Sequence, residues 1–125
     1  MGEEAIARAV IDSAFKVHTA LGPGLLESAY EACVDYELVK LRLSVQKQVP
    51  ISIRYQDKAL GIGYRIDLLV ENKVVVEVKC AEHLHPLHRA QLLSYLKLGH
   101  YKLGLLLNFN TVHMRHGIKR VVSGL

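Results

Sequence analysis

Cysteine is scarce in this sequence: only Cys33 and Cys80 are present, far apart and without a CxxC pair. Zinc ribbons and disulfide frameworks need closely spaced or numerous cysteines, so we expect two reduced thiols instead. No apolar run approaches the roughly 18–20 residues of a membrane span. Residues 1–6 are acidic and lack the basic and apolar regions of a signal peptide. We therefore expect a cytoplasmic protein with no membrane partner.

The sequence also lacks internal repeats, low-complexity stretches, linkers and a strong excess of either charge. Lys and Arg number 16 against 12 Asp and Glu, which gives a pI of about 9.1. This mild basic excess is compatible with a nucleic-acid partner but does not require one. With 125 residues, half of them hydrophobic, the chain has the size and composition of one globular domain spanning residues 1–125.

Hydrophobic periodicity predicts helices first and strands afterwards. Apolar residues recur at helical spacing over residues 3–21, and Gly22-Pro23-Gly24 ends that helix. A second helical pattern covers about residues 25–41. Alternation then predicts a strand over 45–55, in which Pro50 indicates an edge position or a bulge.

The second half of the chain alternates strands with one more helix. The expected elements are strands at 63–70 and 74–80, a helix at about 86–98, and strands at 103–109 and 118–122. Residues 71–73 form a three-residue hairpin loop in which Asn72 can take a left-handed conformation. The order α-α-β-β-β-α-β, with a short last strand, predicts a three-layer α/β sandwich: one mixed sheet with helices on both sides.

The expected hairpin places ionisable groups among valines and leucines. With residues 71–73 as the loop, Asp67 faces Glu77, and Lys79 shares their face of the strand pair. Two facing carboxylates in apolar surroundings repel each other unless a proton or a cation lies between them. Oxygen ligands favour Mg²⁺ or Mn²⁺ over zinc. An alternative stays open, in which Lys79 forms a buried salt bridge and one acid is exposed.

The two neighbouring helices offer further polar candidates, each with a simpler explanation. Gln91 and Tyr95 are four residues apart and share a helix face with His88, a common arrangement on any helix. Glu27 stands in a first helical turn, where an acid complements the helix dipole. Tyr30 is a plausible core residue. A separate face of the third helix is expected to pack on the sheet: Leu87, Ala90, Leu93 and Leu96.

Cys80, His83, His85 and His88 lie within nine positions of one another. Cysteine and histidine are the usual ligands of transition metals, so such a site is conceivable. Cys80 should point away from the Lys79 side of its strand, however, and Pro86 interrupts the run. We expect a loop that borders the hairpin acids.

These residues together resemble a known pattern. Asp67 followed by Glu77-Val78-Lys79 is similar to the catalytic core of the PD-(D/E)XK nuclease superfamily, although Arg65-Ile66 stands where its name-giving proline is expected. Residues 91–95 (QLLSY) resemble the Q-x-x-x-Y motif of its exonuclease-V-type branch. Residues 24–30 (GLLESAY) resemble the G-x-x-E-x-x-Y signature of one small family. Residues 105–109 and 117–120 resemble its C-terminal part, so the resemblance covers about residues 6–122.

The resemblance implies a restriction-endonuclease-like fold and assigns roles to individual residues. Asp67, Glu77, the Val78 carbonyl and Glu27 would bind one Mg²⁺ or Mn²⁺. Lys79 would orient or help deprotonate the attacking water, or stabilise charge on the phosphate, and Gln91 would position Lys79 or the nucleophile. The implied substrate contacts are Tyr95, Tyr30, His88, Arg65, Arg89 and Lys97.

The expected activity is Mg²⁺-dependent hydrolysis of DNA phosphodiester bonds, with RNA as a second possible substrate and with pairing into a homodimer to span a duplex. Two alternatives remain. The chain can be a binding module for nucleic acid or a partner protein that keeps the nuclease fold without turnover, or a metal-dependent hydrolase of a small phosphate ester.

Overall fold

The computed structural model describes all of residues 1–125 apart from the side chain at position 62, which falls inside a strand. Its elements follow the expected order, with one short 3-10 helix added before the last strand. In chain order they are α1 (Glu3–Leu21), α2 (Glu27–Lys40), β1 (Val45–Tyr55), β2 (Lys58–Val70), β3 (Val74–Lys79), α3 (Pro86–Gly99), β4 (Leu103–Asn108), η1 (Met114–Gly117) and β5 (Ile118–Val122). Within the described residues, no helix has the length and apolarity that crossing a bilayer requires.

The strands form one mixed sheet in the order β1-β2-β3-β4-β5. Only β3 and β4 run parallel, because α3 carries the chain back along the sheet between them. The other neighbouring pairs are antiparallel. β1 is an edge strand, as Pro50 predicted, and the loop between β2 and β3 occupies residues 71–73, as the spacing predicted.

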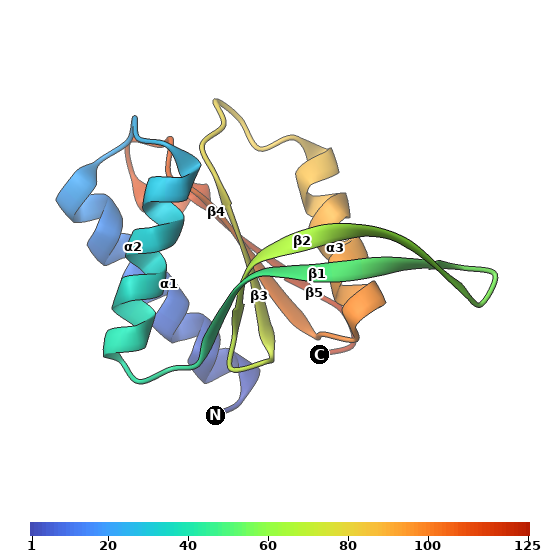
Figure 1. Cartoon of the computed structure of the whole chain (residues 1–125). Coiled ribbons are helices and arrows are strands. Elements are labelled where there is room, and N and C mark those ends of the chain that lie inside the picture. The colour runs from blue at the N-terminus through green and yellow to red at the C-terminus, as the bar shows by residue number, and fades with distance from the viewer.

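Two helices cover one face of the sheet and one helix covers the other (Figure 1). Val10 of α1 and Val34 of α2 pack with the sheet residues Val76 and Leu105 in the larger core cluster. Leu92 of α3 packs on the opposite face. β4 is buried over its whole length, as its continuous apolar run predicted. The predicted three-layer α/β sandwich is therefore confirmed.

Local signals explain where the helices begin and end. α1 ends at Gly22, whose φ of +67° is a conformation that glycine adopts without strain. α3 starts at Pro86, a residue favoured in the first helical turn. A capping box precedes it: the Nδ1 atom of His85 accepts the N–H of Leu87, and the Nδ1 atom of His88 accepts the N–H of His85.

The prediction for the buried face of α3 is half right, because Leu96 is buried and Leu93 is half-buried against the core. Leu87 is 69% exposed and Ala90 is exposed, whereas Leu92 and Tyr95 are buried together with Leu96. The reason is a close approach to β4, where a Cβ atom on Gly104 would lie 2.8 Å from a Leu92 methyl group. Glycine at position 104 thus leaves room for Leu92 to pack directly on β4. The spacing of the leucines in α3 does not reveal this contact.

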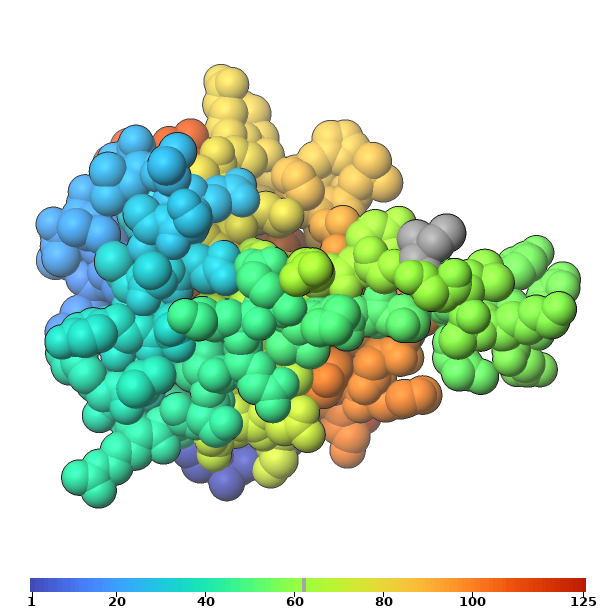
Figure 2. All heavy atoms as spheres, viewed as in Figure 1, coloured from blue at the N-terminus to red at the C-terminus, as the bar shows by residue number. Residues whose placement is uncertain are grey.

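β1 and β2 form a long hairpin whose tip extends beyond the rest of the molecule (Figures 1 and 2). β2 begins at Lys58, earlier than the expected residue 63. The turn at the tip consists of Gln56 and Asp57, which have φ values of +51° and +61°. Two consecutive left-handed residues are typical of the tight turns that close two-residue hairpins. The other end of this hairpin leads directly to the predicted acids.

Candidate active site

Asp67 and Glu77 meet where β2 separates from β3. The ladder between these strands runs from the Val70–Val74 pair to the Leu68–Val76 pair and includes no pair beyond it. At the next position the Asp67 N–H donates to Oε2 of Glu77 at 3.2 Å. The Val78 N–H donates to Oδ2 of Asp67 at 2.9 Å, so a side chain replaces the missing strand partner. The facing arrangement predicted from the hairpin register is therefore present.

A distortion of β1 lies directly across from Asp67. The β1–β2 register is the same directly before and after this point, with Lys47 opposite Leu68 and Val49 opposite Ile66, and it shifts further along, between Ser52 and Arg54. Between them Gln48 has a φ of +53°, and no Gln48–Asp67 pair is formed. As a result Leu68 points into the core under α1 and α2, whereas Ile66 points into the core under α3. Regular alternation would place both residues on one face, so the sheet is twisted at the acid.

Gln48 also binds Asp67 through its side chain. Its Nε2 atom lies 2.9 Å from Oε1 of Glu31 on α2 and 3.4 Å from Oδ1 of Asp67. With the Val78 N–H on Oδ2, both oxygens of Asp67 have a protein donor. The carboxylate is therefore held in one orientation before any ligand arrives.

Glu77 is the buried member of the acidic pair and is only 4% exposed. Burial, and after it the hydrogen bond to Asp67 and the negative charge of Asp67, raise the pKa of Glu77 to about 9. The positive charge of Lys79 lowers the pKa of Glu77, but by less than these effects raise it. Without a cation, Glu77 therefore keeps its proton at neutral pH. A bound cation removes the repulsion that causes this, so the pair has the chemistry of a metal-ligand pair.

The free edge of β3 carries three groups that point the same way. Asp67 accepts the Val78 N–H, and Oε2 of Glu27 accepts the Cys80 N–H at 3.2 Å. The N–H and C=O groups of one strand residue point to the same side of the strand. The Val78 carbonyl therefore lies on this edge too, between the positions bound by Asp67 and Glu27. Two carboxylates and a carbonyl are the oxygen donors that Mg²⁺ and Mn²⁺ prefer.

Histidine, cysteine, aspartate and glutamate side chains do not gather in threes closely enough to hold a metal ion in the described part of the chain. This finding argues against the transition-metal site at Cys80, His83, His85 and His88, because two of these histidines cap α3 instead. The same finding applies to the predicted ligands Asp67, Glu77 and Glu27, whose three carboxylates do not converge on one point in this structure. Mg²⁺ is commonly bound by only one or two carboxylates and keeps several water molecules. The residues around Asp67 and Glu77 fit such an ion.

Lys79 is the last residue of β3 and is half-buried. Alternation along β3 places its side chain on the same face as Glu77, as predicted. Among the described residues, the ion pairs within 4.0 Å do not include Lys79. The alternative of a buried Lys79–carboxylate salt bridge is therefore not found.

α3 brings Tyr95 close to the acids and leaves Gln91 exposed one turn earlier. Tyr95 is 5% exposed, and burial together with the charges of Glu77, Tyr64 and Asp67 raises its pKa to about 12. A hydrogen bond with the Gln91 side chain lowers the pKa of Tyr95, but by less than these effects raise it. Tyr95 therefore packs beside the strands that carry the acids, together with Ile66 and Val75, and its phenol is neutral at physiological pH. The predicted role of Gln91 at the acids stays a prediction.

Tyr30 is a core residue, which confirms one of the two expectations for it, and it is not the substrate contact that the resemblance implied. Its side chain is fully buried, and its ring stacks on Phe109 with 4.4 Å between centroids. Its hydroxyl donates to the Gly22 carbonyl and accepts the Leu25 N–H at 3.1 Å. A side chain with no exposed surface cannot contact a substrate in this structure. Tyr30 instead fixes the loop that leads into α2 and thereby the position of Glu27.

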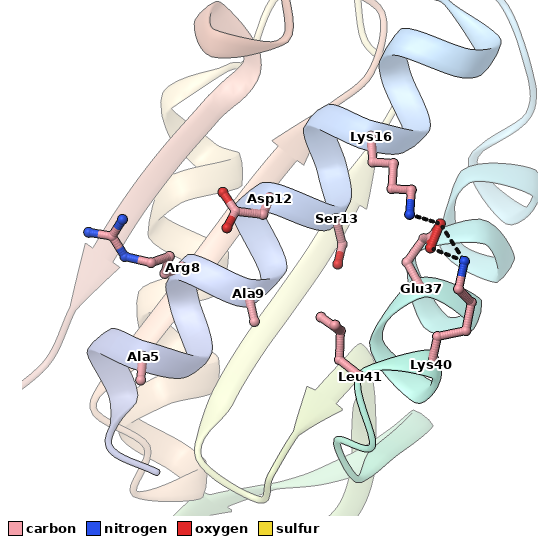
Figure 3. A pocket seen from close by; sticks show the side chains of 9 residues that line it. All are labelled: Ala5, Arg8, Ala9, Asp12, Ser13, Lys16, Glu37, Lys40 and Leu41. Carbon is pink, nitrogen blue, oxygen red and sulfur yellow. Dashed lines mark hydrogen bonds and ion pairs between the residues drawn. The ribbon is translucent and has the colours of Figure 1, made fainter.

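The remaining predicted contacts lie on the surface. Arg65, Arg89 and Lys97 are exposed, and His88 is half-buried by its part in the cap of α3. A separate groove of about 350 Å³ lies between α1 and α2, on the other side of the molecule's sheet from α3 (Figure 3). Two of its three cations are already paired, since Lys16 and Lys40 both lie within 3.5 Å of the Glu37 carboxylate. None of the predicted site residues lines it.

Sequence reasoning missed Gln48 and Glu31. Glu31 follows Glu27 by four residues, so a helical projection already places both on one face of α2. Burial raises the pKa of Glu31, and the charge of Asp67 adds to the effect. Gln48 gave no signal beyond the irregularity that Pro50 indicated two residues later. Its contact with Asp67 depends on the left-handed backbone conformation at position 48, and a glutamine in the sequence gives no indication of that conformation.

Comparison with known families agrees with this geometry. The family model of the PD-(D/E)XK nuclease superfamily matches residues 4–121, a range that contains all the residues of the candidate site. Comparisons with curated proteins and with solved structures give no significant match. The mixed sheet between two helical layers is consistent with the restriction-endonuclease-like fold of that superfamily. The chain therefore belongs to the PD-(D/E)XK nuclease superfamily.

Proposed function

We propose that the protein is a metal-dependent nuclease that hydrolyses DNA phosphodiester bonds at the point where β2 leaves β3. One observation carries the proposal: Asp67 and Glu77 are joined through backbone N–H groups at the open edge of β3, with Lys79 two residues further along. Members of the superfamily generally hydrolyse phosphodiester bonds and generally use Mg²⁺ or Mn²⁺. The finer assignment to DNA and to individual residues is our inference.

Asp67, Glu77, the Val78 carbonyl and Glu27 would hold the metal ion. When bound, the ion supplies a polarised phosphate oxygen and a water molecule of lowered pKa. The chain prepares this site in two ways. Gln48 and the Val78 N–H fix the Asp67 carboxylate, and Tyr30 fixes the start of the helix that carries Glu27. These contacts reduce the reorganisation needed at the moment of reaction.

Lys79 would supply the positive charge of the reaction. On the Glu77 face, its ammonium group can hold the attacking water or stabilise negative charge on the phosphate. Gln91 would position Lys79 or that water from α3, and Tyr95 would support the site from its buried position. Arg65 and Arg89 are exposed and would contact flanking phosphates, with His88 at the start of α3 as a further contact.

The G-x-x-E-x-x-Y branch is the subfamily that we propose for this chain. Residues 24–30 carry the pattern, and the three residues that define it make different contacts. Gly24 has a φ of +104° and turns the chain before α2. Glu27 reaches the edge of β3, and Tyr30 holds the preceding loop. The spacing is thus accounted for by one helix start that delivers a carboxylate to the site.

A cleavage panel tests the proposal. Single-stranded, duplex, flapped and four-way-junction DNA, and RNA, would be incubated with Mg²⁺, Mn²⁺ or EDTA. We expect metal-dependent cleavage that falls at least about 100-fold in Lys79→Ala and Asp67→Ala. Lys16→Ala is the control, because it removes one exposed positive charge from α1. Lys79→Ala cleaving like wild type under every condition would overturn the assignment. Nucleic-acid binding without cleavage by any of the proteins would favour the binding module.

A further inference from the structure

We propose that a groove between α3 and β2 receives an unpaired base of the nucleic-acid substrate, next to the bond that is cut. This inference deepens the proposed function and rests on it for the identity of the ligand. The groove has a volume of about 290 Å³, and Tyr64 of β2 faces Gln91, Ser94 and Tyr95 of α3 across it. This volume is just below the range typical of drug-sized ligands and suits a single flat ring system.

The groove adjoins the candidate site. Tyr95 lines the groove and also packs in the core cluster with Ile66 and Val75, which come from the two strands that carry the acids. Ile66 directly precedes Asp67 in β2, and Val75 lies two residues before Glu77 in β3. On the groove side, the Tyr95 ring lies 5.8 Å from the ring of Tyr64, centroid to centroid. A strand whose phosphate lies at the acids can therefore place a neighbouring base in the groove, next to Tyr64.

The lining of the groove selects a neutral aromatic group. The described side chains around it are all uncharged, so it does not suit a phosphate. Tyr64 is 46% exposed and offers a ring face on which a base can stack. The Ser94 hydroxyl donates to the Ala90 carbonyl at 3.0 Å, so its lone pairs stay free to accept from a base edge. Gln91 adds an amide that can both donate and accept.

Base pairing decides which substrates can use the groove. In a continuous duplex, the faces of each base are covered by its neighbours and its edge is paired, so entry requires the base to leave the stack. In a single strand, a flap or a junction the base is already free. The groove thus favours DNA that is single-stranded or locally unpaired at the cleavage point.

The test uses a single-stranded oligonucleotide with one fluorescent 2-aminopurine base, bound in EDTA so that no cleavage occurs. We expect wild type and Tyr64→Phe to quench the fluorescence, because both keep a ring for stacking. Tyr64→Ala should lose the quenching and bind roughly 5- to 100-fold more weakly. The control is Tyr55→Ala, which removes an exposed tyrosine near the hairpin tip, outside the groove. Thermal denaturation confirms that each variant is folded.

Four outcomes separate this inference from the proposed function. Quenching through Tyr64 in a protein that cleaves nothing supports the groove and rejects the hydrolysis. Cleavage in which Tyr64→Ala leaves quenching, affinity and KM unchanged supports the hydrolysis and rejects the groove. Equal losses in Tyr55→Ala and Tyr64→Ala also reject it. A wild-type protein that neither binds nor quenches the oligonucleotide overturns it as well.

Discussion

Glu77 and Asp67 lie side by side in a partly buried space: Glu77 is 4% exposed and accepts a hydrogen bond from the backbone of Asp67, which is itself half-buried. Two ionised carboxylates cannot occupy such a space without a counter-charge. The pair therefore exists in two forms, one with a proton and one with a cation. Exchange of the proton for the cation is the elementary event on which the proposed activity depends.

The first prediction concerns the pH dependence of stability in the metal-free protein. The pKa of Glu77 is about 9 when folded, against an ordinary value of 4.5. Between these values the folded state holds a proton that the unfolded state has released. The stability that this proton contributes is therefore greatest at the acidic end and is lost as the pH rises to about 9. One such proton changes the free energy of unfolding by about 1.4 kcal/mol per pH unit.

Glu77→Gln tests this prediction, because glutamine resembles the protonated acid and cannot ionise. Urea denaturation in EDTA between about pH 6 and 8 should show a smaller decline in the free energy of unfolding for Glu77→Gln than for wild type. The variant should also bind Mn²⁺ more weakly by calorimetry. Equal pH slopes for the two proteins would contradict the assignment of the proton to Glu77.

The second prediction concerns Gln48, whose amide fixes one oxygen of Asp67. Gln48→Asn keeps an amide and suits the left-handed backbone, but its side chain is too short to make both contacts. We expect Mn²⁺ affinity to fall roughly 10-fold, as for other groups that orient a metal ligand, while the melting temperature stays near that of wild type. Calorimetric titration measures the affinity, with Gln46→Asn on the same strand as control. Unchanged affinity in Gln48→Asn would show that Asp67 needs no such support.

At the scale of helices and strands, periodicity was sufficient to place the elements and insufficient to orient one of them. The bounds of α1, β1 and β5 agree with the predictions, because breakers and alternation mark their ends clearly. α3 is rotated relative to the prediction. Several apolar stripes run along its sequence, and the choice between them depends on Gly104 in another strand. Contacts of that kind are invisible to a local pattern.

At the site, too, some features could be predicted from local spacing and others could not. The three-residue loop fixes the hairpin register, so Asp67 opposite Glu77 could be predicted from spacing alone. The distortion of β1 at Gln48 could not, because it depends on a backbone conformation that glutamine rarely adopts. Tyr30 was identified by its motif, but only packing against Phe109 separates a core residue from a substrate contact.

The third prediction concerns the ends of β3 and β4, which Asn108 ties together beside the site. Its side chain donates to the Ala81 carbonyl at 2.9 Å and accepts the N–H groups of Ala81 and Asn110 at 3.1 and 3.2 Å. Asn108 is buried, so Asn108→Ala leaves these groups without partners. We expect a loss of about 1–3 kcal/mol in the free energy of unfolding. Urea denaturation measures it against Asn110→Ala, an exposed control; equal stability of the two variants would contradict the role.

For the whole molecule, the modest charge excess limits how strongly the protein would bind nucleic acid if the proposed function holds. The formal net charge is +4, and the basic residues are dispersed along the chain. We therefore expect the proposed binding to depend on a few cations near the site. Lys79, Arg65 and Arg89 are the three that the proposal uses.

The fourth prediction follows from that number. Three phosphate contacts to a single strand imply that affinity falls roughly 20-fold when salt rises from about 50 to 200 mM. Arg65→Ala and Arg89→Ala should each lower the slope of log affinity against log salt by about 0.7. Fluorescence anisotropy in EDTA measures the slope, and Arg8→Ala on α1 should leave it unchanged. A slope near that of eight or more contacts would mean that a wider surface binds the strand.

The turn at Gln56 and Asp57 also divides the chain into two pieces that share the proposed site. Gln48 precedes the turn, whereas Asp67 and Glu77 follow it. The tip is exposed, so cutting the backbone there removes no core contact, and β1 still has its full length of β2 to pair with. Neither piece alone carries the complete set of groups. The fold is therefore suited to fragment complementation. Each half would be inactive alone, and two halves fused to interacting proteins would regain the proposed hydrolysis only when those proteins bind each other.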